Sequence, residues 1–132
     1  MVINRGAFLQ GHYQKVFDEI AAIKEACGEA RLKVILETAA LTDEQIAKAC
    51  QRCESAGADF VKTATGFHPA GGADVRAIKI MHETVGGRLG IKASGGIRNI
   101  EFATELINAG ATRLGLSSSR AILDGVTATG SY

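Results

Sequence analysis

Two lysines, each following a short apolar segment, are the residues of this sequence best suited to chemistry. Lys62 comes directly after the segment from Ala58 to Val61, and Lys92 ends the segment that starts at Leu89. An ammonium group at the end of a buried strand costs desolvation free energy unless the protein uses the charge there. In parallel α/β folds, ligands bind and reactions occur at that end of the strands. Both lysines are therefore candidate functional residues.

The spacing of the two lysines indicates how one amine becomes reactive. They are 30 positions apart, about one strand–helix unit, so we expect Lys62 and Lys92 on neighbouring strands. Two ammonium groups about 6 Å apart repel by about 3 kcal/mol at an effective dielectric constant of about 20. Repulsion and burial both lower the pKa of a lysine, and the free amine can then attack a carbonyl carbon. In the alternative interpretation, both side chains simply extend into solvent from the strand ends.

Glycines and serines after the later strands are suited to hold an anion. Gly95 and Gly96 follow the second lysine, and Ser117 and Ser118 follow the segment from Thr112 to Leu116. Glycine amides can approach an anion closely, and the last two loops of a βα barrel often bind phosphate. A plain turn after a strand also uses Gly-Gly, so this motif alone leaves both roles open.

The elements that must position these residues alternate along the chain. Apolar positions spaced three and four residues apart predict helices, and Thr42 with Gln45 has the pattern of a capping box at a helix start. Alternating strands and helices predict a parallel sheet with right-handed crossovers. The expected strands are Lys33–Leu36, Ala58–Val61, Leu89–Lys92 and Thr112–Leu116, and the expected helices are 12–27, 42–56, 73–85, 99–109 and 118–124.

The distribution of the candidate residues favours a barrel over a doubly wound sheet. They lie at the ends of several successive strands, as in a βα barrel, and no Gly-x-Gly-x-x-Gly follows the first strand. We therefore expect an α/β fold of the TIM-barrel type. The chain is predicted to form one domain, 1–132, holding a partial barrel of about four or five βα units.

Composition narrows the range of partners. The chain has 15 basic and 14 acidic residues and a net charge of +1, so it has no global field that would attract nucleic acid or an anionic membrane. Its apolar runs are far shorter than the roughly 20 residues that span a bilayer, and Met1 to Gly6 lacks the pattern of a signal peptide. These features predict a cytoplasmic protein without nucleic-acid or membrane partners. Cys50 and Cys53 fall on the apolar face of a predicted helix, which indicates buried thiols and no metal site.

Three motifs, in this order, resemble those of the deoxyribose-phosphate aldolases. They are Gly-Ala-Asp-Phe-Val-Lys-Thr-Ala-Thr-Gly-Phe from Gly57, Lys-Ala-Ser-Gly-Gly-Ile-Arg from Lys92, and Gly-x-Ser-Ser from Gly115. The likeness extends over nearly the whole chain, including Val2-Ile3-Asn4 and the segment Lys33–Thr38. It implies a class I aldolase, a carbon–carbon lyase of deoxyribonucleotide catabolism. Such an enzyme cleaves 2-deoxy-D-ribose 5-phosphate into glyceraldehyde 3-phosphate and acetaldehyde through a lysine Schiff base, with no metal or other cofactor.

The resemblance also implies a role for individual residues. Lys62 matches the Schiff-base lysine, and Lys92 matches the second lysine that tunes it. Tyr132 ends the chain, and some family members use a carboxyl-terminal tyrosine in proton transfer. The residues that match the family's phosphate-holding loops are Gly66, Gly95, Gly96, Ser117 and Ser118.

The match begins at about the fourth strand of the family's eight-stranded barrel, which takes about 200 residues or more. The family's proton-transferring aspartate would stand just before Met1. We therefore expect Schiff-base formation with weak turnover. The alternative function is a non-catalytic half barrel that exposes an apolar inner face and pairs with itself or with an amino-terminal half. Because four strands cannot close a barrel and two copies provide eight, a homodimer or larger homo-oligomer is expected.

Overall fold

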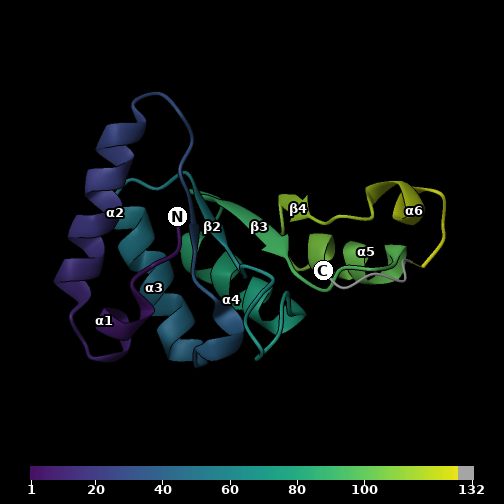
Figure 1. Cartoon of the computed structure of the whole chain (residues 1–132), viewed down its shortest axis with the longest axis horizontal. Helices are drawn as coiled ribbons and strands as arrows, with labels where there is room; N and C mark the ends of the chain where they lie inside the picture. The colour runs from purple at the N-terminus through teal and green to yellow at the C-terminus, as the bar shows by residue number, and fades with distance from the viewer. Residues whose placement is uncertain (128–132) are drawn as a thin grey trace.

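Four parallel strands form one sheet, and their order across the sheet is their order along the chain (Figure 1). The computed structural model describes residues 1–127. A single parallel bridge between Val2 and Ile35 places the amino-terminal segment beside the first strand. The predicted alternation of strands and helices in a parallel sheet is therefore confirmed. The strands are β1 (Lys33–Ile35), β2 (Phe60–Lys62), β3 (Gly90–Ser94) and β4 (Arg113–Gly115).

Helices occupy the connections between the strands. The longer ones agree with the sequence predictions to within two residues at each end, but two short elements, α1 and η1, were not predicted. Each has fewer residues than two helical turns, which is too short for the helical spacing of apolar residues to be recognised. The helical elements are α1 (Arg5–Leu9), α2 (Tyr13–Cys27), η1 (Thr38–Ala40), α3 (Asp43–Ser55), α4 (Val75–Val85), α5 (Ile100–Asn108) and α6 (Ser119–Leu123).

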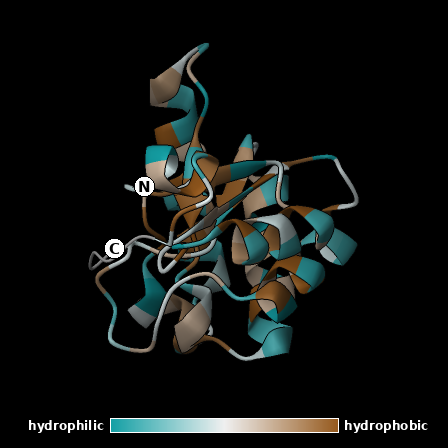
Figure 2. Ribbon diagram, turned by 90° about the vertical axis from the view of Figure 1, so that its right-hand side faces the viewer, coloured by the Kyte–Doolittle hydropathy of each residue, from teal (hydrophilic) through white to brown (hydrophobic). Residues whose placement is uncertain are grey.

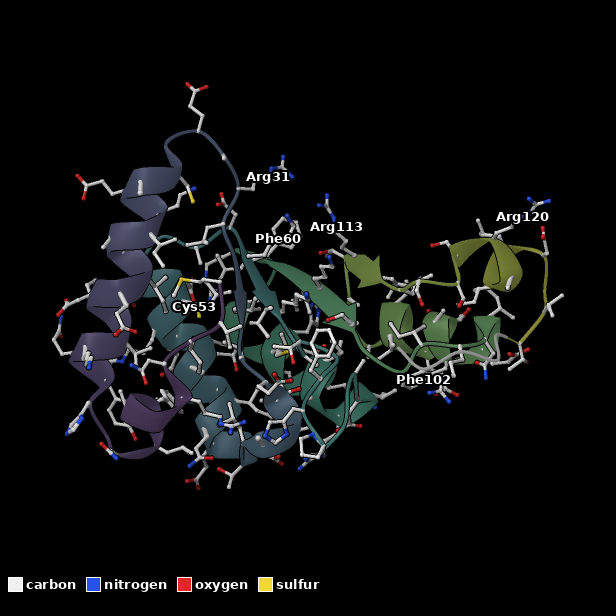
Figure 3. The ribbon with its side chains drawn as sticks, viewed as in Figure 1. Arg31, Cys53, Phe60, Phe102, Arg113 and Arg120 are labelled. Atoms are coloured by element: carbon white, nitrogen blue, oxygen red, sulfur yellow. The ribbon has the colours of Figure 1, made fainter. Side chains whose placement is uncertain are left out.

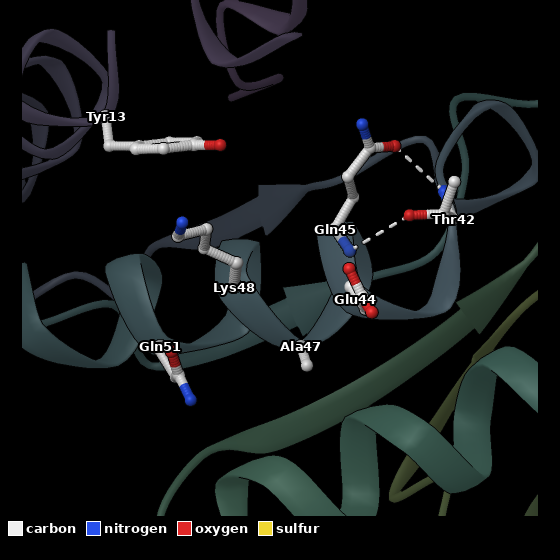
Figure 4. Close-up of a pocket in the computed structure, with 7 residues that line it drawn as sticks. All are labelled: Tyr13, Thr42, Glu44, Gln45, Ala47, Lys48 and Gln51. Carbon is white, nitrogen blue, oxygen red and sulfur yellow. Dashed lines mark hydrogen bonds between the residues drawn. The ribbon is translucent and has the colours of Figure 1, made fainter. Parts of the chain in front are cut away.

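Local hydrogen bonds at the helix ends explain several of these boundaries. Thr42 Oγ1 accepts a hydrogen bond from the Gln45 amide at 3.3 Å, and Gln45 Oε1 accepts one from the Thr42 amide at 2.9 Å. This reciprocal pair is the predicted capping box at the start of α3 (Figure 4). At the other end of a helix, Gly86 adopts the left-handed conformation (φ 53°) that closes α4.

The hydrophobic core lies between the sheet and the helices. Side chains alternate between the two faces of a strand, and Val34, Val61 and Ile91 all face the helix side, where they are completely or almost completely buried. Buried residues of α2, α3 and α4 complete this core. In Figure 2 the strands at the centre of the molecule are largely brown, in agreement with this arrangement.

The opposite face of the sheet carries positive charge, which differs from the apolar inner face that the sequence predicted. By strand alternation and register, Lys33, Lys62, Lys92 and Arg113 belong to this face. Its main apolar side chain, Phe60, is only 8% exposed.

Two of those cations explain why Phe60 is covered. Lys33 Nζ lies 5.6 Å and Arg113 Cζ lies 5.0 Å from the centroid of the Phe60 ring. Figure 3 shows Phe60 and Arg113 near one another at one end of the sheet. The ring also covers Gly90, where a Cβ atom would lie 2.2 Å from Phe60 Cε1. Cation–π contacts and a neighbouring glycine therefore accommodate this aromatic ring on a polar face.

Several large apolar side chains are exposed to solvent. They include Ile107 of α5 and Leu123 of α6, which are 53% and 81% exposed. Among residues 1–127, no helix has both the length and the apolar character needed to cross a membrane.

Candidate active site

Lys62 and Lys92 lie side by side at the carboxyl ends of neighbouring strands, as their spacing predicted. They are register partners in the β2–β3 pair, and both are partly buried. The Lys92 side chain lies over Gly115 of β4, where a Cβ atom would be 2.7 Å from Lys92 Cε and 3.3 Å from Lys92 Nζ. A glycine at position 115 therefore leaves the space that the second lysine occupies.

The surroundings of Lys62 lower the pKa of its ammonium group. Burial is the largest cause, and the positive charge of Lys92 is the second. Lys33 lowers this pKa further, whereas the carboxylate of Glu37 raises it. The direction agrees with the sequence prediction, and the structure adds that burial contributes more than repulsion. A lowered pKa increases the fraction of free amine near neutral pH, which is the reactive form toward a carbonyl.

Glu37 interacts with the loop that follows Lys62. Its Oε1 accepts a hydrogen bond from the Thr65 amide at 3.1 Å, and its Oε2 accepts one from the Thr65 hydroxyl at 2.7 Å. Glu37 has a left-handed backbone (φ 60°, ψ 56°), which explains why β1 ends at Ile35 rather than at the predicted Leu36. The carboxylate thereby attaches the end of β1 to the loop after β2.

A second set of hydrogen bonds joins the end of β2 to the end of β3. The Thr63 hydroxyl donates to the Ser94 carbonyl oxygen at 3.0 Å and accepts from the Ser94 amide at 2.9 Å. The Ser94 hydroxyl donates to the Ala64 carbonyl oxygen at 2.7 Å. All of these groups are buried, so the bonds fix the backbone on both sides of the lysine pair.

The loop after β2 also crosses the loop after β3 at a pair of glycines. A Cβ atom at Gly72 would lie 2.4 Å from the Gly95 carbonyl oxygen, so the two backbones are in direct contact. The Ala73 amide donates to that same oxygen at 2.9 Å. Gly95 therefore has a structural role in joining the two loops, in addition to any role in binding a ligand.

The structure brings the predicted anion-binding residues to the same end of the sheet as the lysines. Gly95 and Gly96 directly follow β3, and Ser117 and Ser118 follow β4, its neighbour in the sheet. Gly66 lies in the loop after β2. All three glycines have positive φ angles, 90°, 92° and 77° at Gly66, Gly95 and Gly96, which side chains other than glycine rarely adopt. Tyr132 lies outside the described residues.

The cysteines and a large surface groove are separate from this site. Cys50 and Cys53 are buried in α3, and burial raises the pKa of the Cys50 thiol to about 12. Among residues 1–127, no three His, Cys, Asp or Glu side chains are grouped as metal ligands. A groove of about 490 Å³ lies between Tyr13 and α3, where Lys48 Nζ is 4.1 Å from the Tyr13 ring centroid (Figure 4). None of the predicted site residues lines it.

Sequence reasoning missed part of the supporting structure. Ser94 and Gly72 were not singled out, and Thr63 was expected only to supply a hydroxyl to a loop that closes on a ligand. From the sequence, the position of Glu37 at a strand end fits either a group that orients water or substrate or a salt-bridge partner of a lysine. In the structure, both oxygens of the Glu37 carboxylate accept hydrogen bonds from Thr65. A signal for Ser94 was present, since each lysine is followed within two positions by a hydroxyl residue.

Comparisons with known proteins give consistent matches. A family model described as DeoC/LacD family aldolase matches residues 1–125. The curated deoxyribose-phosphate aldolase of Nocardia farcinica is 62% identical over 126 residues, which are 95% of this chain and 57% of that protein. The chain thus spans little more than half the length of such relatives.

The chain is also similar to solved structures of deoxyribose-phosphate aldolases. A putative deoxyribose-phosphate aldolase from Coccidioides immitis is similar with a TM-score of 0.90 and 40% identity, over 94% of this chain and 50% of that chain. A structure described as a unique tetrameric deoxyribose phosphate aldolase, from Aeropyrum pernix, has a TM-score of 0.78 and 32% identity, over 85% of this chain and 49% of that chain. These similarities confirm the predicted fold class, a partial barrel of the TIM type.

The lowered pKa of Lys62 leads to a prediction about stability. Between the folded pKa and the unfolded value near about 10.4, the unfolded chain binds more protons, so the free energy of unfolding rises with pH in this window. Replacing the cation by a neutral side chain of similar length, Lys62→Met, should therefore stabilise the fold at neutral pH. The gain should shrink as the pH rises toward the unfolded value.

Urea unfolding of the parent and variant chains at several pH values measures this effect. Lys79→Met, on the exposed surface of α4, is the matched control and should show no comparable gain. A variant that is less stable than the parent at pH 7, or a gain that does not change with pH, would contradict the account.

Proposed function

The chain belongs to the DeoC/LacD family of aldolases, and on that premise we propose that it forms a Schiff base between Lys62 and an aldehyde substrate. The observation that carries the proposal is the in-register pairing of Lys62 with Lys92, in surroundings that lower the pKa of Lys62. The reaction is then a class I aldol cleavage, which needs no metal or other cofactor because the amine itself provides the electron-accepting group.

The steps follow from the chemistry of an amine. The neutral Lys62 nitrogen attacks the carbonyl carbon, and a proton moves from nitrogen to oxygen to give a carbinolamine. Loss of water then produces an iminium ion. The substrate carbons are numbered from the carbon that is bonded to the lysine nitrogen. The electrons of the bond between the second and third of these carbons move into the iminium ion. That bond breaks as the hydroxyl group on the third carbon loses its proton to water and becomes the carbonyl group of the first aldehyde product, and an enamine remains on the lysine. Protonation of the enamine carbon and hydrolysis of the resulting iminium ion then release the second aldehyde and the free lysine. Burial and, after it, the positive charge of Lys92 lower the pKa of Lys62 and so favour its neutral, nucleophilic form.

We propose 2-deoxy-D-ribose 5-phosphate as the substrate and glyceraldehyde 3-phosphate and acetaldehyde as the products. The support is the name of the curated relatives and the position of the glycine and serine loops beside the lysines. Outside helices and strands, no backbone–backbone hydrogen bond of residues 1–127 uses the amides of Gly95 or Gly96. The Ser118 side chain makes no capping bond to α6. The proposed phosphate ligands are Gly66, Gly95, Gly96, Ser117 and Ser118, and Tyr132 is the proposed proton-transfer residue.

Labelling with acetaldehyde and borohydride tests the Schiff base directly. Reduction of the iminium ion leaves a stable ethyl group, and peptide mass mapping should find it on Lys62. Lys62→Ala should lose at least about 10-fold of the total label, since the lowered pKa of Lys62 makes this amine the reactive one. Lys79→Ala should retain the label.

Label spread over other lysines, or undiminished in Lys62→Ala, would falsify the assignment. Retro-aldol turnover of deoxyribose 5-phosphate, measured separately, decides whether the chain completes the reaction or only forms the covalent adduct.

Phosphate binding is tested by titrating the ¹⁵N-labelled chain with inorganic phosphate. The amide resonances of Gly95, Gly96 and Ser118 should shift together and saturate. Gly96→Ala should weaken binding, because an alanine is strained at a φ of 77° and would displace the loop. Gly87→Ala is the matched control, with a φ of 80° and equally open surroundings. Equal weakening in both variants, or shifts scattered over the surface, would reject the site.

We also propose that the chain associates with itself as a homodimer or larger homo-oligomer. The support is the exposed apolar surface of α5 and α6, where Ile107 and Leu123 flank a groove of about 270 Å³. The solved Aeropyrum pernix relative is described as a tetramer. Light scattering at micromolar concentration should give at least twice the chain mass, and a monomeric mass would count against the proposal. A cytoplasmic location stays a prediction from the sequence.

A further inference from the structure

We propose that Glu37 is a positioning residue for the reactive lysine, holding the loop after β2 through Thr65 while its charge acts on the Lys62 amine. The proposal rests on the proposed Schiff-base function of Lys62. It goes beyond that function by assigning a role to a carboxylate that is hydrogen-bonded to Thr65 through both of its oxygens.

The Glu37 carboxylate is buried and hydrogen-bonded to a single residue. Glu37 is 5% exposed, and its two oxygens accept from two different groups of Thr65, the amide at 3.1 Å and the hydroxyl at 2.7 Å. A buried carboxylate held by two donors of one residue fixes that residue in position and orientation. Thr65 stands three positions after Lys62, so its position limits the conformations of the intervening backbone.

The backbone of Glu37 adopts a conformation that is uncommon outside glycine. Within residues 1–127, it is the only residue other than glycine with a positive φ. On either side of it, the Leu36 amide donates to the Lys62 carbonyl oxygen and the Thr38 amide donates to the Thr63 carbonyl oxygen, both at 2.9 Å. The residues on either side of Glu37 are thus hydrogen-bonded to the last residue of β2 and to the residue that follows it. A strained conformation kept between two such bonds is typical of functional sites.

Glu37 also acts on Lys62 through its negative charge. The charged groups that act on Lys62 are Lys92 from β3, Lys33 from β1 and Glu37 from the end of β1. The two lysines lower the pKa of Lys62, and Glu37 raises it. The carboxylate therefore opposes the lysines and determines how far the pKa of the amine falls.

The effect of Glu37 extends to the proposed phosphate loop through backbone contacts. The loop that begins with Thr63 and contains Thr65 meets Gly95 at Gly72, where the two backbones touch. Holding the first part of this loop therefore constrains both the lysine and the glycine that follows β3.

Three variants separate the two effects. Glu37→Gln removes the charge but keeps an oxygen that can accept from Thr65, so the pH midpoint of acetaldehyde–borohydride labelling at Lys62 should move to lower pH. Thr65→Val removes only the hydroxyl, so it should lower the labelling yield without moving the midpoint. Glu37→Ala removes both functions and should lower the yield by about 10- to 10²-fold, because a misplaced nucleophile loses its alignment with the carbonyl. Glu44→Gln, exposed on α3, is the matched control and should change neither quantity.

Hydrogen exchange of the Thr65 amide provides a readout that does not depend on labelling. Exchange should be faster in Glu37→Ala than in the parent and unchanged in Glu44→Gln. If Lys62 is not labelled in the parent while exchange responds as expected, the proposed function fails and the positioning contact stands. If the parent is labelled but Glu37→Gln keeps the parental midpoint, or Glu37→Ala keeps the parental yield and exchange rate, the inference is overturned.

Discussion

The register of the β2–β3 pair is the constraint on which the site depends. It sets Lys62 directly beside Lys92, so the positive charge of Lys92 raises the free energy of the charged form of Lys62. A shift of either strand by one residue would turn its lysine to the helix side of the sheet and remove the pair. The core residues next in sequence, Val61 and Ile91, are fully buried on that side and thereby maintain the register.

Polar contacts beyond the strand ends keep the lysine pair in place. Glu37 holds Thr65, Thr63 exchanges hydrogen bonds with Ser94, and Gly72 rests on Gly95. Together these contacts connect the ends of β1, β2 and β3 through buried groups. The Lys62 side chain is therefore placed by a backbone that these hydrogen bonds hold in position, which favours alignment with a carbonyl.

Much of this arrangement could be predicted from the sequence, because it depends on local patterns. The four strands, the longer helices and the neighbouring lysines follow from apolar spacing and from the distance between Lys62 and Lys92 along the chain. The contact of Glu37 with Thr65 could not be predicted, since it joins residues 28 positions apart and needs a left-handed backbone at a glutamate. The cationic inner face was also missed, because assigning Lys33 and Arg113 to it requires knowing which face the helices cover.

The central claim is that Lys62 is an amine with a lowered pKa because it is buried beside Lys92. An NMR titration of the Lys62 Cε resonance, in the parent chain and in Lys92→Met, measures that pKa directly. We predict a midpoint below the ordinary lysine value of about 10.4 in the parent and a higher midpoint in the variant, where the repulsion is gone. An ordinary midpoint in the parent, or the same midpoint in both chains, would contradict the account.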